Sequence, residues 1–383
     1  MHLVAKTYQG LESLLADEIK KLGAQNVQEV SRAVLFEGDK ELLYRANYTL
    51  RTALRILVKI FEFEARNEEQ LYLYIKKFDW EKCLSADDTF AIDAVVNSEY
   101  FTHSHFVALK VKDGIADWFR ERTGVRPSVD TNFPNVKINV HISDTKVTVS
   151  LDSSGESLHI RNYKVAKVHA PLSEVMAAAL VLLSNWEKNK PLADPFCGSG
   201  TILTEAAMIA MNMPCQINRK LFGFMSWRNF DNTLWQKVIR QAKSGIDNDI
   251  SLKIVGFDNQ QNAVIAAQKN IAALGLQDKI SVHRKSFELL EPPFASGIII
   301  TNPPYHERLK DENDEALYGE IGSRLKHFYS GYSVWIFSGF EAGIKAIGLK
   351  PSKKIKLLNG AIECKFLQFE LYAGSKKDKS VIN

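Results

Sequence analysis

Two glycines stand in a run that could hold a ligand against the main chain, Asp194-Pro195-Phe196-Cys197-Gly198-Ser199-Gly200-Thr201. The run separates a short apolar stretch from a helical pattern, so it is expected to connect a strand to a helix. Glycine permits sharp turns and close ligand approach, and the N–H groups that open a helix attract carboxylates or phosphates. The third glycine of the dinucleotide fingerprint and the Gly-Lys-Ser/Thr ending of the phosphate loop are absent. The run therefore predicts a ligand loop of another kind, with a plain turn as the alternative.

A second candidate is Asp258, which ends the next apolar stretch in the sequence Gly256-Phe257-Asp258. A carboxylate at the end of this strand can accept hydrogen bonds from both hydroxyls of a ribose. The alternative is an ordinary cap at the start of the following helix. The aromatic-rich residues 211–250 separate the two motifs, and they fit either a base-stacking platform or simple core packing.

The third motif is Thr301-Asn302-Pro303-Pro304-Tyr305, directly after the apolar run 297–300. Two consecutive prolines force an extended, rigid exit from a strand and leave carbonyls that can only accept hydrogen bonds. Asn302 adds a side-chain acceptor and Tyr305 adds a flat ring. Two acceptors and a stacking face suit a planar base that carries an exocyclic NH2 group, whereas a generic loop is the alternative.

These motifs lie in a half of the chain where strand and helix patterns alternate. From residue 169 onward, expected strands at 192–194, 253–257, 280–283, 297–301 and 333–338 are interspersed with helices at 173–186, 202–210, 261–274 and 315–328. This alternation predicts an α/β fold, with a mostly parallel sheet covered by helices. Two final strands, 353–358 and 362–372, flank Asn359-Gly360 and predict an antiparallel hairpin at the end of the sheet.

The first half has a different pattern, with strands and helices in an α+β order. Residues 1–60 predict strands at 2–6, 27–30 and 33–36, helices at 11–22 and 40–50, and the start of a long alternating strand at 53–65. Residues 61–155 predict helices at 68–76 and 103–121 and strands at 90–96, 136–142 and 146–151. Residues 156–168 are expected to be a linker, and 169–383 to form the α/β domain.

The first and third motifs, in this order, resemble motifs I and IV of the S-adenosylmethionine-dependent amino-methyltransferases. Residues 167–174, Lys-Val-His-Ala-Pro-Leu-Ser-Glu, resemble the segment before motif I in the THUMP-domain 23S rRNA guanine-N2 methyltransferases (RlmL-like, without the second fused methyltransferase). The resemblance extends through Gly38-Asp39, 44–47, 50–53, 111–113, 126–127 and 150–163. It implies a Rossmann-like methyltransferase domain that follows an N-terminal RNA-binding module. The module consists of a ferredoxin-like segment (1–60) and a THUMP domain (61–155).

The resemblance also implies roles for individual residues. The expected catalytic set is Asn302, Pro303, Pro304 and Tyr305. The expected S-adenosylmethionine-binding set is Asp194, Pro195, Phe196, Cys197, Gly198, Ser199, Gly200, Thr201, Asp258, Asn259, Ser286, Phe287 and Asn302. Ser286 stands where related enzymes usually carry an Asp that meets the adenine amine, and Phe287 is the alternative contact there.

The implied reaction is direct methyl transfer to the N2 amine of a guanine in 23S rRNA or a large-subunit precursor. A THUMP-type tRNA guanine-N2 methyltransferase shares the same site and is the first alternative. A DNA adenine-N6 enzyme shares the Asn-Pro-Pro-Tyr motif but would lack the N-terminal module. A catalytically silent RNA-binding assembly factor is the alternative of another class, and a Rossmann dehydrogenase is disfavoured by the missing third glycine.

Composition limits the mode of RNA binding. The 383 residues carry 49 Lys and Arg against 45 Asp and Glu, and residues 1–168 carry 23 against 24, so the expected RNA-binding half is not basic overall. A polybasic coat on RNA is excluded, and attraction must come from local clusters with a shallow salt dependence. The candidates are Lys110, Lys112, Arg120, Arg122, Arg126 and Lys167, or Lys353, Lys354 and Lys356.

The remaining features predict a cytoplasmic protein without a metal. Four scattered cysteines form no CxxC pair, and no HExxH pattern occurs, so reduced thiols and no metal site are expected. The apolar stretches are far shorter than the roughly 20 residues of a membrane helix, and the N-terminus does not resemble a signal peptide.

Overall fold

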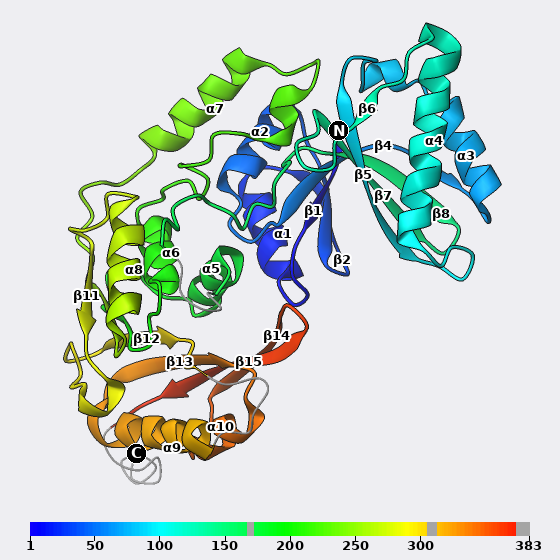
Figure 1. Cartoon of the computed structure of the whole chain (residues 1–383). Helices are drawn as coiled ribbons and strands as arrows, with labels where there is room; N and C mark the ends of the chain where they lie inside the picture. The colour runs from blue at the N-terminus through cyan, green and yellow to red at the C-terminus, as the bar shows by residue number, and fades with distance from the viewer. Residues whose placement is uncertain (167–171, 305–311, 373–383) are drawn as a thin grey trace. The chain divides into compact units, whose positions relative to one another are not determined.

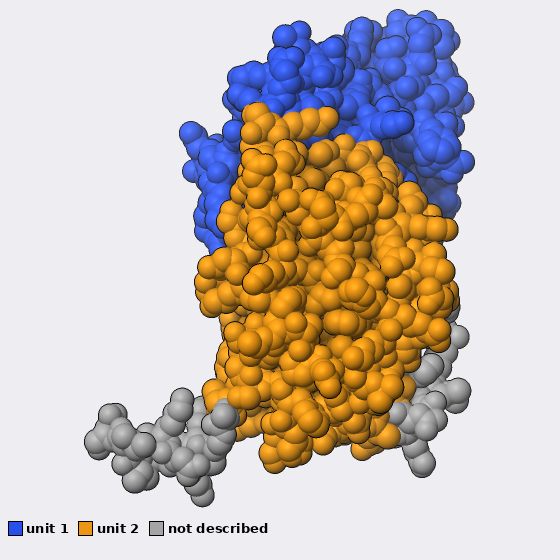
Figure 2. All heavy atoms as spheres, turned by 90° about the vertical axis from the view of Figure 1, so that its left-hand side faces the viewer, with its two compact units in different colours: residues 1–7, 15–160, 219–241 blue, residues 8–14, 161–218, 242–383 orange. Residues whose placement is uncertain are grey.

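The computed structural model describes residues 1–166, 172–304 and 312–372 of the chain (Figure 1). The protein forms two compact units that alternate along the sequence, as the two colours of Figure 2 mark. Unit 1 contains residues 1–7, 15–160 and 219–241, and unit 2 contains residues 8–14, 161–218 and 242–383. Residues 219–241, which the sequence places inside the α/β half, therefore fold with the N-terminal unit.

Unit 1 is built on one eight-stranded sheet with the order β2-β3-β1-β4-β8-β7-β5-β6. Its strands are β1 (His2–Lys6), β2 (Gln25–Val30), β3 (Ala33–Glu37), β4 (Arg55–Glu64), β5 (Thr89–Asn97), β6 (Ser128–Val129), β7 (Val136–Ser143) and β8 (Lys146–Asp152). The antiparallel pairing of β4 with β8 joins the two halves of the sheet. Because the segments 1–60 and 61–155 share this sheet, they form one continuous unit.

The helices of unit 1 bury one apolar side each. They are α1 (Glu12–Lys21), α2 (Lys40–Thr49), α3 (Glu68–Lys77), α4 (Ser104–Thr123) and most of α7 (Asn232–Ser244), with a short 3-10 turn η1 (Trp80–Lys82). The side chains of Asp39 and Asn67 cap α2 and α3 by accepting from backbone N–H groups at 2.8 and 2.9 Å. Gly124, with φ +72°, ends α4 in the left-handed conformation that glycine adopts without strain.

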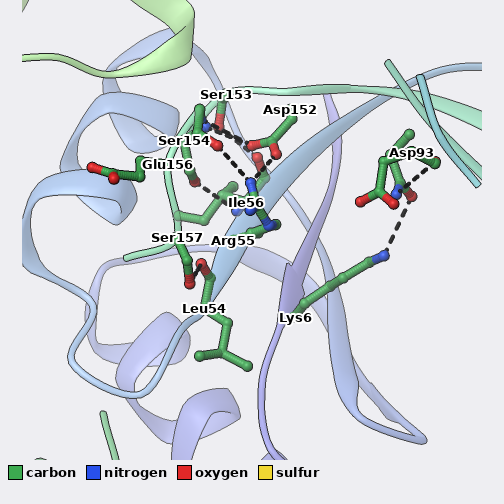
Figure 3. A network of polar contacts seen from close by, with 12 residues as sticks. Lys6, Leu54, Arg55, Ile56, Asp93, Asp152, Ser153, Ser154, Glu156 and Ser157 are labelled. Carbon is green, nitrogen blue, oxygen red and sulfur yellow. Dashed lines mark hydrogen bonds and ion pairs between the residues drawn. The ribbon is translucent and has the colours of Figure 1, made fainter. Parts of the chain in front are cut away.

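A polar turn follows β8, directly before the residues 156–168 that the sequence predicts as a linker (Figure 3). Asp152 accepts from the backbone N–H groups of Ser154 and Gly155 at 2.9 and 3.1 Å, and pairs with Arg55 at 2.5 Å. Arg219, from the start of the 219–241 segment, donates to the carbonyls of Ser154 and Glu156 at 2.9 and 2.7 Å. These bonds satisfy backbone groups of residues 154–156, which lie beyond the end of the β8 ladder.

Unit 2 is built on a seven-stranded sheet with the order β11-β10-β9-β12-β13-β15-β14. Its strands are β9 (Leu192–Asp194), β10 (Ile254–Asp258), β11 (Ile280–Arg284), β12 (Gly297–Thr301), β13 (Tyr332–Ser338), β14 (Lys353–Asn359) and β15 (Ile362–Glu370). The first five neighbours are parallel, and β15 and β14 are antiparallel, as the sequence predicts. The helices are α5 (Glu174–Leu183), α6 (Thr201–Ala210), α8 (Gln261–Ala272), α9 (Glu312–Phe328) and α10 (Glu341–Ala346), with the 3-10 turn η3 (Phe287–Leu289).

Several local features differ from the sequence prediction, and β6, η1, η3 and α10 are among the elements that it does not contain. The segment 211–250 contains the 3-10 turn η2 (Gly223–Ser226) and helix α7, neither of which the sequence pattern predicts. The final hairpin turns at Gly360 and Ala361, one residue later than predicted, because Asn359 still pairs with Ile362. Within the described ranges, no helix is long and apolar enough to span a membrane.

Candidate active site

The three sequence motifs lie at the carboxyl ends of three adjacent strands of unit 2. β9 is the central strand of the three, with β10 on one side and β12 on the other. Parallel strands bring their carboxyl ends to one edge, and ligands bind where the strand order reverses. The hydroxyl of Thr301, at the end of β12, donates to Asp194 at the end of β9 over 2.6 Å. The structure therefore joins motif I and the Asn-Pro-Pro segment directly.

Asp194 is a buried carboxyl group, only 1% exposed. Burial raises its pKa to about 7, although the hydrogen bonds from Thr301 and from the Phe196 backbone N–H act in the opposite direction. The negative charge of Asp258 adds to the rise. Asp194 consequently changes its charge near neutral pH, which a carboxylate at the surface does not do.

The motif I loop holds its two glycines for different reasons. Both have positive φ angles, +53° at Gly198 and +77° at Gly200. A Cβ atom on Gly200 would lie 3.1 Å from the Cβ of Ala267 on α8, a tight contact, and the positive φ angle strains any other residue there. A Cβ atom on Gly198 would meet nothing within 4 Å, so the backbone faces open space at this residue. Gly198 is therefore the place where a ligand can approach the main chain closely.

The other loop residues fix this shape. The backbone N–H of Cys197 donates to the Phe257 carbonyl at 2.9 Å, and Gly200 donates to the Cys197 carbonyl at 2.8 Å. Burial raises the pKa of the Cys197 thiol well above its ordinary value, so the thiol stays neutral. The hydroxyls of Ser199 and Thr201 lie 3.3 Å apart and are buried. Pro195 is also buried, and Phe196 is partly exposed.

Asp258 contacts the motif I loop through one of its carboxylate oxygens. Its Oδ2 accepts from the Gly198 backbone N–H at 3.0 Å, and its Oδ1 accepts from the Gln260 backbone N–H at 2.9 Å. A carboxylate offers about four acceptor positions, so two remain for a ligand. The second bond is a local turn onto Gln260, which is itself the N-cap residue of α8, so Asp258 does not cap that helix as the alternative supposes.

Asn302 carries a buried acceptor that has no donor. Its side-chain Oδ1 is inaccessible to solvent, and none of the residues that the structure describes donates a hydrogen bond to it. An unsatisfied buried acceptor costs roughly 1–3 kcal/mol, so such a group is expected to have a functional partner. The neighbouring carbonyl of Pro303 accepts a long hydrogen bond, 3.4 Å, from the Tyr318 hydroxyl, which leaves its second lone pair available. Two acceptors therefore stand together after β12, while Pro304 is exposed.

The remaining predicted cofactor residues follow β10 and β11. Asn259 is exposed, and its carbonyl accepts from Arg284 at 3.1 Å. Ser286 is partly exposed and precedes η3. Phe287 is 3% exposed, with its ring 5.4 Å from that of Phe196. The structure thus brings Ser286 and Phe287 to the strand edge that carries Asp258. Tyr305 lies outside the described residues.

Two polar side chains that the sequence analysis does not identify support the candidate site, Asn270 at the motif I loop and Tyr318 at the Asn-Pro-Pro segment. Asn270 on α8 is fully buried and donates to the Ser199 carbonyl at 3.2 Å, while it exchanges two hydrogen bonds with the backbone of Ala166. Tyr318 on α9 donates to Pro303 and lies 2.8 Å from the Ser338 hydroxyl. The sequence signal for Asn270 is an Asn on an otherwise apolar helix face. No local sequence pattern marks Tyr318.

The basic residues predicted to bind RNA do not form one face. On α4, Lys110 and Lys112 are about 200° apart around the helix axis, and Arg120 points away from the buried side. Lys112 pairs with Asp113 at 2.9 Å, and Arg120 pairs with Asp117 at 3.3 Å. The other two candidates, Arg122 and Arg126, are exposed, and Arg122 lies over the Trp118 ring. Lys167 lies outside the described residues.

The cysteines and acidic residues offer no metal site in the described ranges. No group of three or more His, Cys, Asp or Glu side chains that could hold an ion occurs there, and Cys83, Cys197, Cys215 and Cys364 are all free thiols. The aromatic residues of 211–250 are mainly core, since Phe222, Phe224 and Trp235 are at most 3% exposed. The packing alternative of the sequence analysis therefore describes these three rings.

The parallel sheet, the glycine loop and the paired acceptors define an S-adenosylmethionine-dependent methyltransferase. The RMKL-like methyltransferase domain family matches residues 161–368, the THUMP domain matches 65–152, and the RlmL ferredoxin-like domain matches 2–57. The chain belongs to this RMKL-like methyltransferase family.

Individual relatives agree with this assignment. The chain is 38% identical to slr0064 of Synechocystis sp., provisionally named an RNA methyltransferase, over 96% of both chains. It is 37% identical to the ribosomal RNA large subunit methyltransferase K/L of Syntrophotalea carbinolica, over 95% of this chain and 52% of that protein. The chain thus spans about half the length of the K/L relatives. The crystal structure of SMU.472 complexed with SAH has a TM-score of 0.87 and 32% identity, and covers 98% of this chain and 99% of that one.

Proposed function

We propose that this protein transfers a methyl group from S-adenosylmethionine to the exocyclic N2 amine of a guanine in 23S rRNA, and that it acts in the cytoplasm. The observation that carries the proposal is the pair of acceptors formed by the unpartnered Asn302 Oδ1 and the Pro303 carbonyl. The THUMP match and the K/L relatives support RNA as the substrate class.

The acceptor pair suits an amine better than any other nucleophile of a base. An exocyclic amine is a weak nucleophile because its lone pair is conjugated with the ring. Its two N–H groups match the two acceptors, and hydrogen bonds to them favour a pyramidal nitrogen whose lone pair is free to react. Orientation of this kind is the main contribution the chain can make, because the cofactor supplies an already activated methyl group. Tyr305 is proposed to stack on a base that has left its helix.

The proposed cofactor contacts rest on two observations at the carboxyl ends of the strands: the open space at Gly198 and the acceptor positions left on Asp258. Gly198, Ser199 and Gly200, with the flanking Pro195, Phe196, Cys197 and Thr201, are proposed to line the methionine part. Asp258 has two acceptor positions left for the ribose hydroxyls. Asp194 is proposed to contact the methionine end, and Asn259, Ser286 and Phe287 the adenine end.

Asp258→Ala is expected to weaken S-adenosylhomocysteine binding by tens of fold, or about 2 kcal/mol. The substitution removes the ribose acceptors and the bond that holds the Gly198 N–H. Isothermal titration calorimetry measures the change. Asp249→Ala, which removes an exposed carboxylate of the same unit, is the matched control and should bind normally. An unchanged affinity in Asp258→Ala would contradict the ribose role.

The affinity for S-adenosylhomocysteine should fall as the pH drops below about 7. Burial holds the pKa of Asp194 at about 7 in the free protein, and the cationic ammonium of the ligand requires the ionised carboxylate. Binding must therefore release a proton at low pH, so affinity is complete above pH 7 and decreases by up to about tenfold per unit below it. Calorimetry between pH 5.5 and 8 tests this. Asp194→Asn should flatten the profile, and an equally steep profile in that variant would exclude Asp194 as the source.

Transfer of a tritiated methyl group to naked 23S rRNA, tRNA and DNA tests the reaction itself. The proposal expects label in 23S rRNA, and mass spectrometry of nuclease fragments should place it on one guanine as N2-methylguanine. Label in tRNA alone would move the assignment to the tRNA alternative. The absence of transfer to any RNA would overturn the proposed function.

A further inference from the structure

The segment 219–241 is held on unit 1 by aromatic packing. Tyr44 of α2 stacks on Phe224 with 4.4 Å between ring centroids, and Tyr48 meets Trp235 edge to face at 5.5 Å. Arg219 anchors the start of the segment by donating to the carbonyls after β8. The backbone of this segment is therefore fixed on unit 1, and so are the positions from which its outward side chains extend.

The same segment reverses the net charge of unit 1. Without it, residues 1–7 and 15–160 carry 20 Lys and Arg against 23 Asp and Glu, a net of −3. The segment adds five basic residues and one acidic residue, a net of +4, which brings the unit to +1. One of the five, Arg219, is buried and bound to carbonyls, whereas the others are exposed: Lys220, Arg228, Lys237 and Arg240.

Helix α7 places two of these cations on one outward face. Trp235 and Val238 are its buried residues, and Lys237 and Arg240 lie about 200° and 140° around the axis from Trp235. They are three residues apart and thus neighbours on the helix surface. The helix itself contains no Asp or Glu. Lys237 pairs with Glu41 of α2 at 2.8 Å and remains 48% exposed.

Helix α4, where the sequence suggests RNA binding, differs in the placement of its charges. Its basic residues point in several directions, and the helix carries its own acidic residues, of which Asp113 and Asp117 pair with Lys112 and Arg120. We infer that the outer face of α7, with Lys237 and Arg240 at its centre and Arg228 beside it in sequence, binds the phosphate backbone of the RNA substrate. The inference rests on the proposed function. Phosphate contacts carry no sequence information, so this surface should add affinity without sequence preference.

The test is binding of a fluorescent 23S rRNA fragment by the full chain at several salt concentrations. Lys237→Ala with Arg240→Ala should weaken binding at least about tenfold at 0.1 M salt and reduce the slope of log K against log salt by about 1.5–2. Lys20→Ala with Lys21→Ala removes the same charge from α1 and should change neither quantity. Glu41→Gln, which releases Lys237 from its ion pair, should instead strengthen binding severalfold.

The failure of this inference is distinguishable from failure of the proposed function. The α7 variant should keep its melting temperature, its affinity for S-adenosylhomocysteine and its kcat at saturating RNA, while the KM for RNA rises. Wild-type RNA affinity in that variant would overturn the inference. An acidic protein would then be the partner that the α7 surface fits. A loss in Lys112→Ala with Arg120→Ala but none in the α7 variant would overturn it in favour of α4. If the wild-type protein methylates no RNA, the proposed function fails instead.

Discussion

Asn302→Ala is expected to lower kcat by at least about 10²–10³-fold and to leave S-adenosylhomocysteine affinity within a fewfold of normal. Alanine lacks the buried Oδ1, which accepts no hydrogen bond from the described residues, so an incoming amine loses one of its two acceptors. The remaining acceptor, the Pro303 carbonyl, can hold only one of the two N–H groups, so it cannot orient the nitrogen alone. Single-turnover methyl transfer to 23S rRNA measures the loss without interference from product release.

A folding defect would be visible separately. Removing an unsatisfied buried acceptor should not destabilise the fold, and a small rise in melting temperature is the expected direction. Asn262→Ala, an exposed Asn on α8 of the same unit, is the matched control and should retain full activity. Turnover near the wild-type rate in Asn302→Ala would exclude the proposed orientation of the amine.

Glu205→Gln is expected to destabilise the protein by roughly 3–5 kcal/mol, because it leaves a buried charge without its counter-ion. Glu205 lies on α6, directly behind the motif I loop. Its carboxylate pairs with the Arg161 guanidinium and accepts from the Tyr163 hydroxyl at 2.9 Å. Both charged side chains have no exposure to solvent. Although burial alone would lower it, the charge of Glu205 raises the pKa of Arg161 above its ordinary range.

Urea unfolding at constant pH measures this destabilisation. Arg161→Met combined with Glu205→Gln should recover a large part of the loss, since no unpaired charge remains and the amide oxygen still accepts from Tyr163. Glu187→Gln breaks the surface pair with Lys190, whose partners are 60% and 58% exposed, and should cost at most about 1 kcal/mol. A loss below about 1 kcal/mol in Glu205→Gln would show that the buried pair does not hold α6 in place.

Much of the candidate site could be predicted from short stretches of sequence. Gly198 and Gly200, Asp258, and Asn302 with Pro303 each follow an apolar strand within a few residues, and local rules for glycine, proline and strand patterns identify them. The order of parallel strands then brings them to one edge, where Thr301 meets Asp194. The supports of the site were not predictable in this way. Asn270 is 71 residues from the Ser199 carbonyl that it binds, and no local pattern encodes that distance.

The sequence by itself determined the fold class, the position of the proposed ligand loop and of the proposed acceptor pair, and the resemblance to a methyltransferase family. These depend on local conformational preferences, whose range is a few residues. Only the tertiary structure decided that residues 219–241 fold with unit 1, which moves a net charge of +4 to the unit that contains the THUMP domain. It also decided that Glu205 meets Arg161, and that Lys237 and Arg240 share one open face while the cations of α4 do not. Such pairings depend on burial between segments far apart in the chain, and their free energy appears only when those segments pack.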